Sequence, residues 1–103
     1  MVTLNRIGGS EFVAKMIGLF LEEAPQRIAA ARAGEQSRRF EDIAAAAHSL
    51  KSSAHTLGAS KLSRLAEKLE QLAGREQMDA IPALLREVEE SFSAAKAWLE
   101  TQR

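Results

Sequence analysis

Apolar residues recur at spacings of three and four along almost the whole chain, and this periodicity limits the fold more than any other feature. Such spacings place side chains on one face of an α-helix, and no stretch shows the alternation that is typical of a strand. A helix with one apolar stripe is not stable alone, and short connections favour antiparallel neighbours. We therefore predict an all-α fold, an antiparallel up-down four-helix bundle with a short extra N-terminal helix at residues 2 to 7.

The four expected bundle helices cover residues 10 to 34, 37 to 57, 60 to 74 and 79 to 99. Each contributes one apolar stripe to the predicted core. The first two stripes are Phe12, Val13, Met16, Ile17, Phe20, Leu21, Ala24 and Ile28, then Phe40, Ile43, Ala47, Leu50, Ala54 and Leu57. The last two are Leu62, Leu65, Ala66, Leu69, Leu72 and Ala73, then Ile81, Leu84, Leu85, Val88, Phe92, Ala95 and Leu99.

Residues with strong local preferences set the expected helix ends. Ser10 and Ser37 are suitable N-caps for the first and second helices. Pro25 lacks a backbone N–H, so it should kink or split the first helix, and Gly34 should end it. Gly58 should end the second helix because a left-handed conformation costs glycine little.

Length and composition narrow the functional classes. The chain of 103 residues is expected to form one domain, residues 1 to 103. Its 14 basic and 14 acidic residues give no net charge, which argues against nucleic-acid binding. Without cysteine it fits a reducing compartment, and with neither a signal peptide nor an apolar membrane span we expect a cytoplasmic protein.

Both histidines of the chain lie in one stretch, AHSLKSSAHTLGA, residues 47 to 59. At about 100° per residue, His48 falls roughly 120° from the centre of the apolar stripe, on the flank of its helix. Its neighbours one turn away are Ala44, Ala45, Lys51 and Ser52, and three of these four are small. The sequence thus predicts a flat patch that carries an imidazole with an ammonium beside it.

This patch suits phosphoryl transfer. A neutral imidazole nitrogen is nucleophilic near pH 7, and Lys51 can hold phosphate oxygens. A helical histidine is more often an ordinary surface residue, and the serines near His48 are read as surface hydroxyls. His48 and His55 stand about 10 Å apart along the helix axis, too far to share a metal ion, so no metal site is expected.

The run from His48 to Ala59 resembles the signature of histidine-containing phosphotransfer (HPt) domains of two-component phosphorelays: a histidine, a lysine three residues later, small residues and then Leu-Gly-Ala. GGSEFVAKMIGLFLEEAPQRI resembles the family's first bundle helix, and LSRLAEKLE resembles the helix after the histidine. The resemblance covers essentially the whole chain in order.

The resemblance implies a role for each site residue. His48 would accept the phosphoryl group on its outer ring nitrogen, and Lys51 would contact the phosphoryl oxygens. Glu70 would orient the ring by a hydrogen bond to the inner nitrogen. Ser52 stands where the family often has a glycine, so contact with a partner there is expected to differ. The candidate partner-binding residues lie around His48 on its helix: Ala44, Ala45, Ser52 and His55.

The function implied is that of a monomeric phosphorelay carrier. It would accept a phosphoryl group from the phosphoaspartate of one receiver domain and pass it to an aspartate of a response regulator. Such a carrier is not an enzyme and needs no cofactor, because Mg²⁺ is expected on the receiver. Two alternatives remain open: the histidine-bearing domain of a larger hybrid or chemotaxis-type sensor kinase, and a helical protein-binding module that is never phosphorylated.

Overall fold

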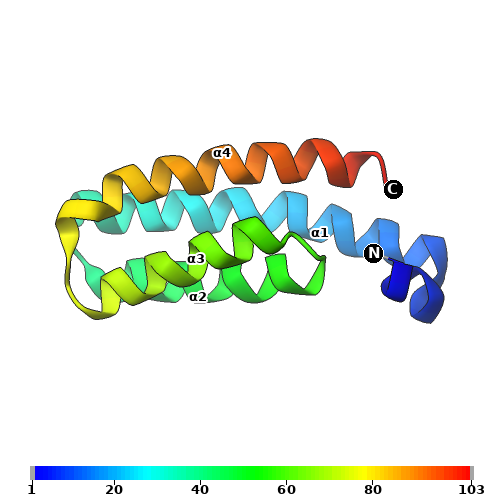
Figure 1. Cartoon of the computed structure of the whole chain (residues 1–103), viewed down its shortest axis with the longest axis horizontal. Coiled ribbons are helices and arrows are strands. Elements are labelled where there is room, and N and C mark those ends of the chain that lie inside the picture. Colours follow the sequence, from blue (N-terminus) through cyan, green and yellow to red (C-terminus); the bar gives the residue numbers. More distant parts are fainter. Residues whose placement is uncertain (1, 103) are drawn as a thin grey trace.

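The computed structural model describes residues 2 to 102, and side chains from residue 11 onward. It contains α1 (Val2–Ser37), α2 (Phe40–Thr56), α3 (Ser60–Gly74), the short 3₁₀ turn η1 (Met78–Ala80) and α4 (Ile81–Glu100). Figure 1 shows the four α-helices running antiparallel to their neighbours, with α2 and α3 as a hairpin against α1 and α4. The predicted all-α up-down bundle is confirmed.

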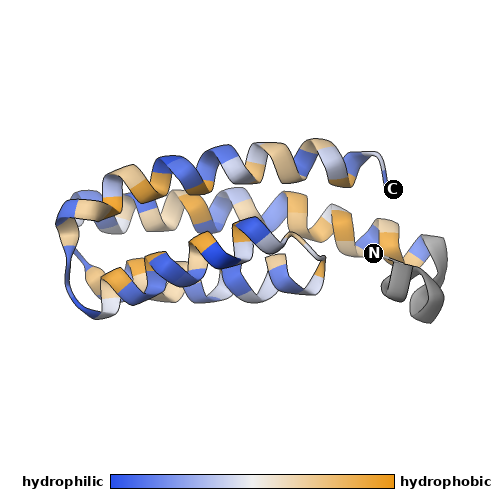
Figure 2. Cartoon of the chain, in the orientation of Figure 1, coloured by the Kyte–Doolittle hydropathy of each residue, from blue (hydrophilic) through white to orange (hydrophobic). Residues whose placement is uncertain are grey.

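The core is built from the predicted stripes. Ile17, Ile43, Leu85 and Leu99 are fully buried, and most other stripe positions are buried or half-buried. Figure 2 shows hydrophobic and hydrophilic residues alternating along each helix, as a one-sided stripe requires. Phe12 is an exception at 42% exposure, whereas the adjacent Val13 is buried.

The predicted ends of the first helix are wrong. Residues 2 to 7 belong to α1 instead of forming a separate helix, since Gly8 and Gly9 cost helix propensity but keep their backbone hydrogen bonds. The helix also continues through Pro25, without the split that we allowed for. Pro25 is exposed, so the carbonyl that loses its helical partner can reach water.

Gly34 lies inside the last turns of α1 and serves a packing role there. A Cβ at this position would stand 2.9 Å from Cγ1 of Ile43 and 3.2 Å from its backbone nitrogen. The helix instead ends at Ser37, and Arg38 takes the left-handed conformation with φ 58°. Ser37 is therefore not the N-cap of α2, whose N-cap is Arg39.

Substitution of Gly34 tests this close approach of α2. Gly34→Ala is expected to lower the free energy of unfolding by about 1 kcal/mol, because overpacking outweighs the gain in helix propensity. Gly74→Ala is the matched control, since a Cβ there meets nothing within 4 Å, and it should raise stability by about 0.5 kcal/mol. Urea unfolding of both variants measures the difference; equal effects would contradict the packing role.

The turn between α2 and α3 follows the sequence. Gly58 has φ 78°, and the backbone N–H of Ala59 donates to the carbonyl of Ala54 at 2.9 Å. This closes α2 as the glycine predicts and starts α3 at Ser60. The short turn holds α2 and α3 side by side, which places the flank of α2 against α3.

Candidate functional site

His48 and Lys51 lie one turn apart on the flank of α2. The buried face of α2 is formed by Ile43, Ala47, Leu50 and other apolar residues, so the two polar side chains point away from the core. The His48 side chain is 63% exposed, whereas Lys51 is only 28% exposed because its stem lies toward α3. The predicted position of His48 outside the core is confirmed.

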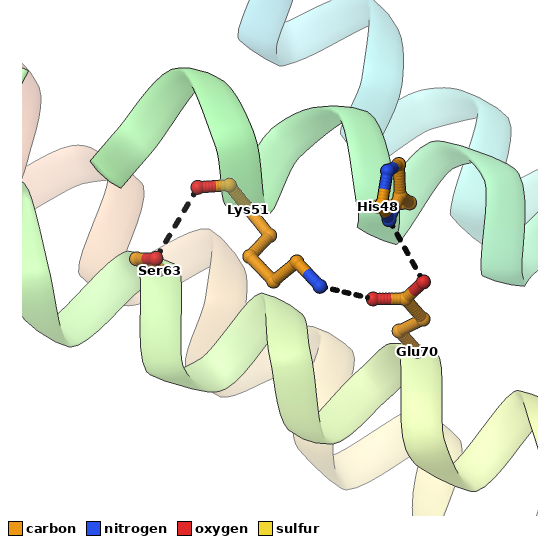
Figure 3. A network of polar contacts seen from close by, with 4 residues as sticks. All are labelled: His48, Lys51, Ser63 and Glu70. Carbon is orange, nitrogen blue, oxygen red and sulfur yellow. Dashed lines mark hydrogen bonds and ion pairs between the residues drawn. The ribbon is translucent and has the colours of Figure 1, made fainter. Parts of the chain in front are cut away.

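Glu70 of α3 connects these two side chains. Its Oε2 lies 2.9 Å from Nδ1 of His48, and its Oε1 accepts a hydrogen bond of 2.8 Å from Nζ of Lys51. Figure 3 shows the carboxylate reaching both partners from the neighbouring helix. One carboxylate therefore fixes the imidazole and the ammonium relative to each other.

A fourth residue, which the sequence did not single out, fixes the helix backbone beneath this network. The Ser63 hydroxyl of α3 donates to the Lys51 carbonyl at 3.2 Å (Figure 3). Serine hydroxyls often bond to backbone carbonyls, but the partner here is 12 residues away on another helix. This bond holds α3 in register with the site.

The carboxylate of Glu70 is held in its ionised form. The hydrogen bond from Lys51 is the largest cause that lowers the pKa of Glu70, and the bond with His48 lowers it further, while partial burial opposes both. The same contact with Glu70 raises the pKa of Lys51. Glu70 and Lys51 thus form an ion pair over the physiological pH range.

The ionised Glu70 determines which ring nitrogen of His48 is free. A carboxylate only accepts hydrogen bonds, so Nδ1 must carry the hydrogen in this contact. In the neutral ring Nε2 then has an unprotonated lone pair. Because the side chain is mostly exposed, the ring presents a nucleophilic nitrogen outward and is anchored by the other.

Replacement of Lys51 tests whether its ammonium is what lowers the pKa of the Glu70 carboxyl. Lys51→Met is expected to raise the pKa of Glu70 toward its ordinary value, measurable by a carboxyl ¹³C NMR titration. A carboxyl whose pKa is lowered in the folded state stabilises the fold above the unfolded pKa, about 4.3 for Glu. That stability is lost as the pH falls through the folded pKa. An unchanged Glu70 titration in Lys51→Met would contradict the ion pair.

Comparison with known proteins identifies the family. The family model for the Hpt domain matches residues 15 to 98. The chain belongs to the Hpt domain family. The structure of histidine-containing phosphotransfer protein B (HptB) from Pseudomonas aeruginosa PAO1 superposes with a TM-score of 0.92 at 22% identity, over 98% of this chain and 87% of that one. A search of curated protein sequences finds no significant match.

Membership establishes the role in outline. Hpt domains are histidine phosphocarriers of two-component phosphorelays that interact with receiver domains; they are not enzymes and need no cofactor of their own. Among the described side chains, no group of three or more potential ligands is arranged to hold a metal ion. No helix between residues 2 and 102 is long and apolar enough to cross a membrane.

The candidate partner-binding residues of this Hpt domain differ in accessibility. Ala45, Ser52 and His55 are exposed, whereas Ala44 is half-buried against the core. His55 has no hydrogen bond to the His48 network among the described residues. The small residues leave the ring of His48 standing above its surroundings.

A shallow groove between α1 and α2 extends this surface beyond the residues that the sequence indicated. Its lining includes Met16, Leu19, Ser52 and Thr56. Leu19 is 51% exposed, the highest value among the large hydrophobic side chains that are exposed in the described part of the chain. On the same helix Ile17 is fully buried and Leu21 is half-buried, so Leu19 is the more accessible of the three. The signal for Leu19 was its position outside the apolar stripe.

Proposed function

We propose that His48 is the phosphoacceptor of this Hpt domain. The observation that supports this most strongly is the anchoring of Nδ1 by Glu70, because in the neutral ring it leaves the lone pair on Nε2, on a side chain that is 63% exposed. Attack by a nucleophile needs a free lone pair that a bulky partner can reach. Of the two histidines, His55 has no such anchor among the described side chains.

The proposed reaction is a direct transfer between side chains. The Nε2 lone pair of His48 forms the N–P bond while the P–O bond to the receiver aspartate breaks, and the bonding electron pair leaves with the aspartate carboxylate. The Nδ1 proton stays on the ring, which gains positive charge. Glu70, already hydrogen-bonded to Nδ1, stabilises that charge, and Lys51 contacts the phosphoryl oxygens. The reverse step passes the group to a response-regulator aspartate.

The receiver is proposed to dock over the exposed flank of α2. Ala45 and Ser52 keep this surface low around His48, and Leu19 adds an apolar contact from α1. We expect the receiver to supply Mg²⁺ for the charge on the phosphoryl group. The domain is proposed to act as a monomer in the cytoplasm, with residues 1 to 103 as one domain.

Transfer from a receiver tests this function. A panel of receiver domains is phosphorylated with ³²P in the presence of Mg²⁺, mixed with the Hpt domain, and the protein label is tested for stability. Label on the Hpt domain that is acid-labile and base-stable is expected, as for phosphohistidine. An Hpt domain that takes label from none of the panel would instead support a binding module that is never phosphorylated.

A further inference from the structure

Lys51 is already engaged before any phosphoryl group arrives. Its Nζ donates to Oε1 of Glu70 at 2.8 Å, in an ion pair in which both side chains are less than one-third exposed. The proposed contact with phosphoryl oxygens places that ammonium near Nε2 of His48. Glu70 instead lies at Nδ1, across the ring. Lys51 therefore has two competing acceptors on opposite sides of one imidazole.

The two acceptors differ in strength. A phosphoryl group carries more negative charge than a carboxylate and offers three acceptor oxygens. Lysine has three donors on a flexible stem, so its ammonium can move without a change in the helix. Glu70 would still be held by Nδ1 of His48 through its other oxygen, Oε2. Figure 3 shows the Lys51 stem leaving α2 and crossing toward α3, with the ammonium at its end directed at Glu70.

We propose that Glu70 and the phosphoryl group compete for Lys51, so that formation of phosphohistidine moves the Lys51 ammonium from Glu70 Oε1 to a phosphoryl oxygen. This inference rests on the proposed function of His48. Glu70 is then a positioning residue with a second effect. By binding Lys51, Glu70 weakens the interaction of the ammonium with the phosphoryl group. The phosphohistidine is then less stabilised, which favours transfer of the phosphoryl group to a receiver.

Competition has a consequence that independent roles do not have. If Glu70 and the phosphoryl group share Lys51, removing Glu70 must increase the effect of Lys51 on the phosphohistidine. If Lys51 contacts the phosphoryl group independently of Glu70, Lys51→Met must change the phosphohistidine lifetime by the same factor with and without Glu70. Glu67 provides a matched control, because it is an exposed carboxylate one turn earlier on α3 and acts on Lys51 only through longer-range attraction.

The experiment uses phosphoramidate as a small phosphoryl donor, so that no partner protein is needed. Nε2 attacks its phosphorus, the P–N bond breaks and ammonia leaves. The lifetime of phosphohistidine at His48 is followed by ³¹P NMR after removal of the donor. Three backgrounds are used: wild type, Glu70→Gln and Glu67→Gln. In each background, the lifetime is compared with that of the same chain carrying Lys51→Met. His48→Gln assigns the phosphohistidine signal, and circular dichroism confirms that every variant is folded.

In the wild-type background, Lys51→Met is expected to shorten the phosphohistidine lifetime by about threefold, and in the Glu70→Gln background by about tenfold. In the Glu67→Gln background the factor should stay at about three. A second readout is the Lys51 Cε resonance in wild type, which should move on phosphorylation.

Each other outcome overturns a different statement. Equal Lys51→Met factors in all three backgrounds, or a Lys51 resonance that does not move when His48 is phosphorylated, would overturn the competition alone. A wild-type chain in which His48 never becomes phosphorylated would overturn the proposed function, and the competition with it. A rise in the Glu67→Gln background equal to that in Glu70→Gln would show that overall charge, and not the contact with Glu70, is responsible.

Discussion

Replacement of His48 by glutamine is expected to lower phosphoryl acceptance by more than about a thousandfold, because an amide has no nucleophilic nitrogen. The same change should leave the fold intact. The side chain is mostly exposed, and the glutamine amide can still donate a hydrogen bond to Glu70. Substitutions at such positions usually change stability by less than about 0.5 kcal/mol.

Two measurements on His48→Gln separate these effects. Label transferred from a phosphorylated receiver reports the chemistry, and thermal unfolding reports the fold. Lost label with a melting temperature within about 3 °C of wild type is expected. If the variant still carried acid-labile label, the phosphoacceptor would have to be His55. If it unfolded, His48 would be part of the structural framework of the bundle.

The second large effect concerns access to His48. Ser52 and Ala45 are exposed side chains of α2 one turn either side of His48. At about 100° per residue, Ser52 lies about 40° from His48 around the helix and Ala45 about 60°, so Ser52 is the more nearly aligned with the ring. Ser52→Trp is expected to slow transfer from a receiver by about 30-fold, and Ala45→Trp by clearly less, because the clash costs about 2 kcal/mol.

Comparison of donors shows whether this effect is steric. Phosphoramidate is small enough to reach Nε2 past a tryptophan, so its reaction with Ser52→Trp should slow much less than transfer from a receiver. Both positions are exposed in the unmodified chain, so neither substitution disturbs the core. Equal effects of the two tryptophans, or equal slowing with both donors, would contradict docking over this flank of α2.

The bundle was predictable because its stripes are regular. In α3 each turn has its apolar residue at the expected spacing, and the helix covers Ser60–Gly74 as predicted. The ends of α1 were not predictable from local preference. Arg38 adopts a left-handed conformation that non-glycine residues usually avoid, and Gly34 is required by contact with Ile43 of another helix. The contact between Gly34 and Ile43 is tertiary packing, which a local pattern does not contain.

The part of the site that lies within one helix was predictable, and the contacts between helices were predictable only in part. Helical spacing places Lys51 beside His48, since both belong to α2. A resemblance suggested that Glu70 would meet the ring, and the structure places its Oε2 at Nδ1. The contact between Glu70 and Lys51 was not foreseen, because it joins residues 19 positions apart on two helices. The relative rotation of α2 and α3 determines that this carboxylate reaches both donors.

The most direct test of the account locates the phosphoryl group itself. Uniformly ¹⁵N-labelled protein is phosphorylated, and the imidazole nitrogens of both histidines are observed by long-range ¹H–¹⁵N correlation. We expect ³¹P coupling at Nε2 of His48, with a hydrogen still on Nδ1 and unchanged signals from His55. A phosphoryl group on Nδ1 of His48, or on His55, would contradict the claim that Glu70 anchors one nitrogen and leaves the other for the reaction.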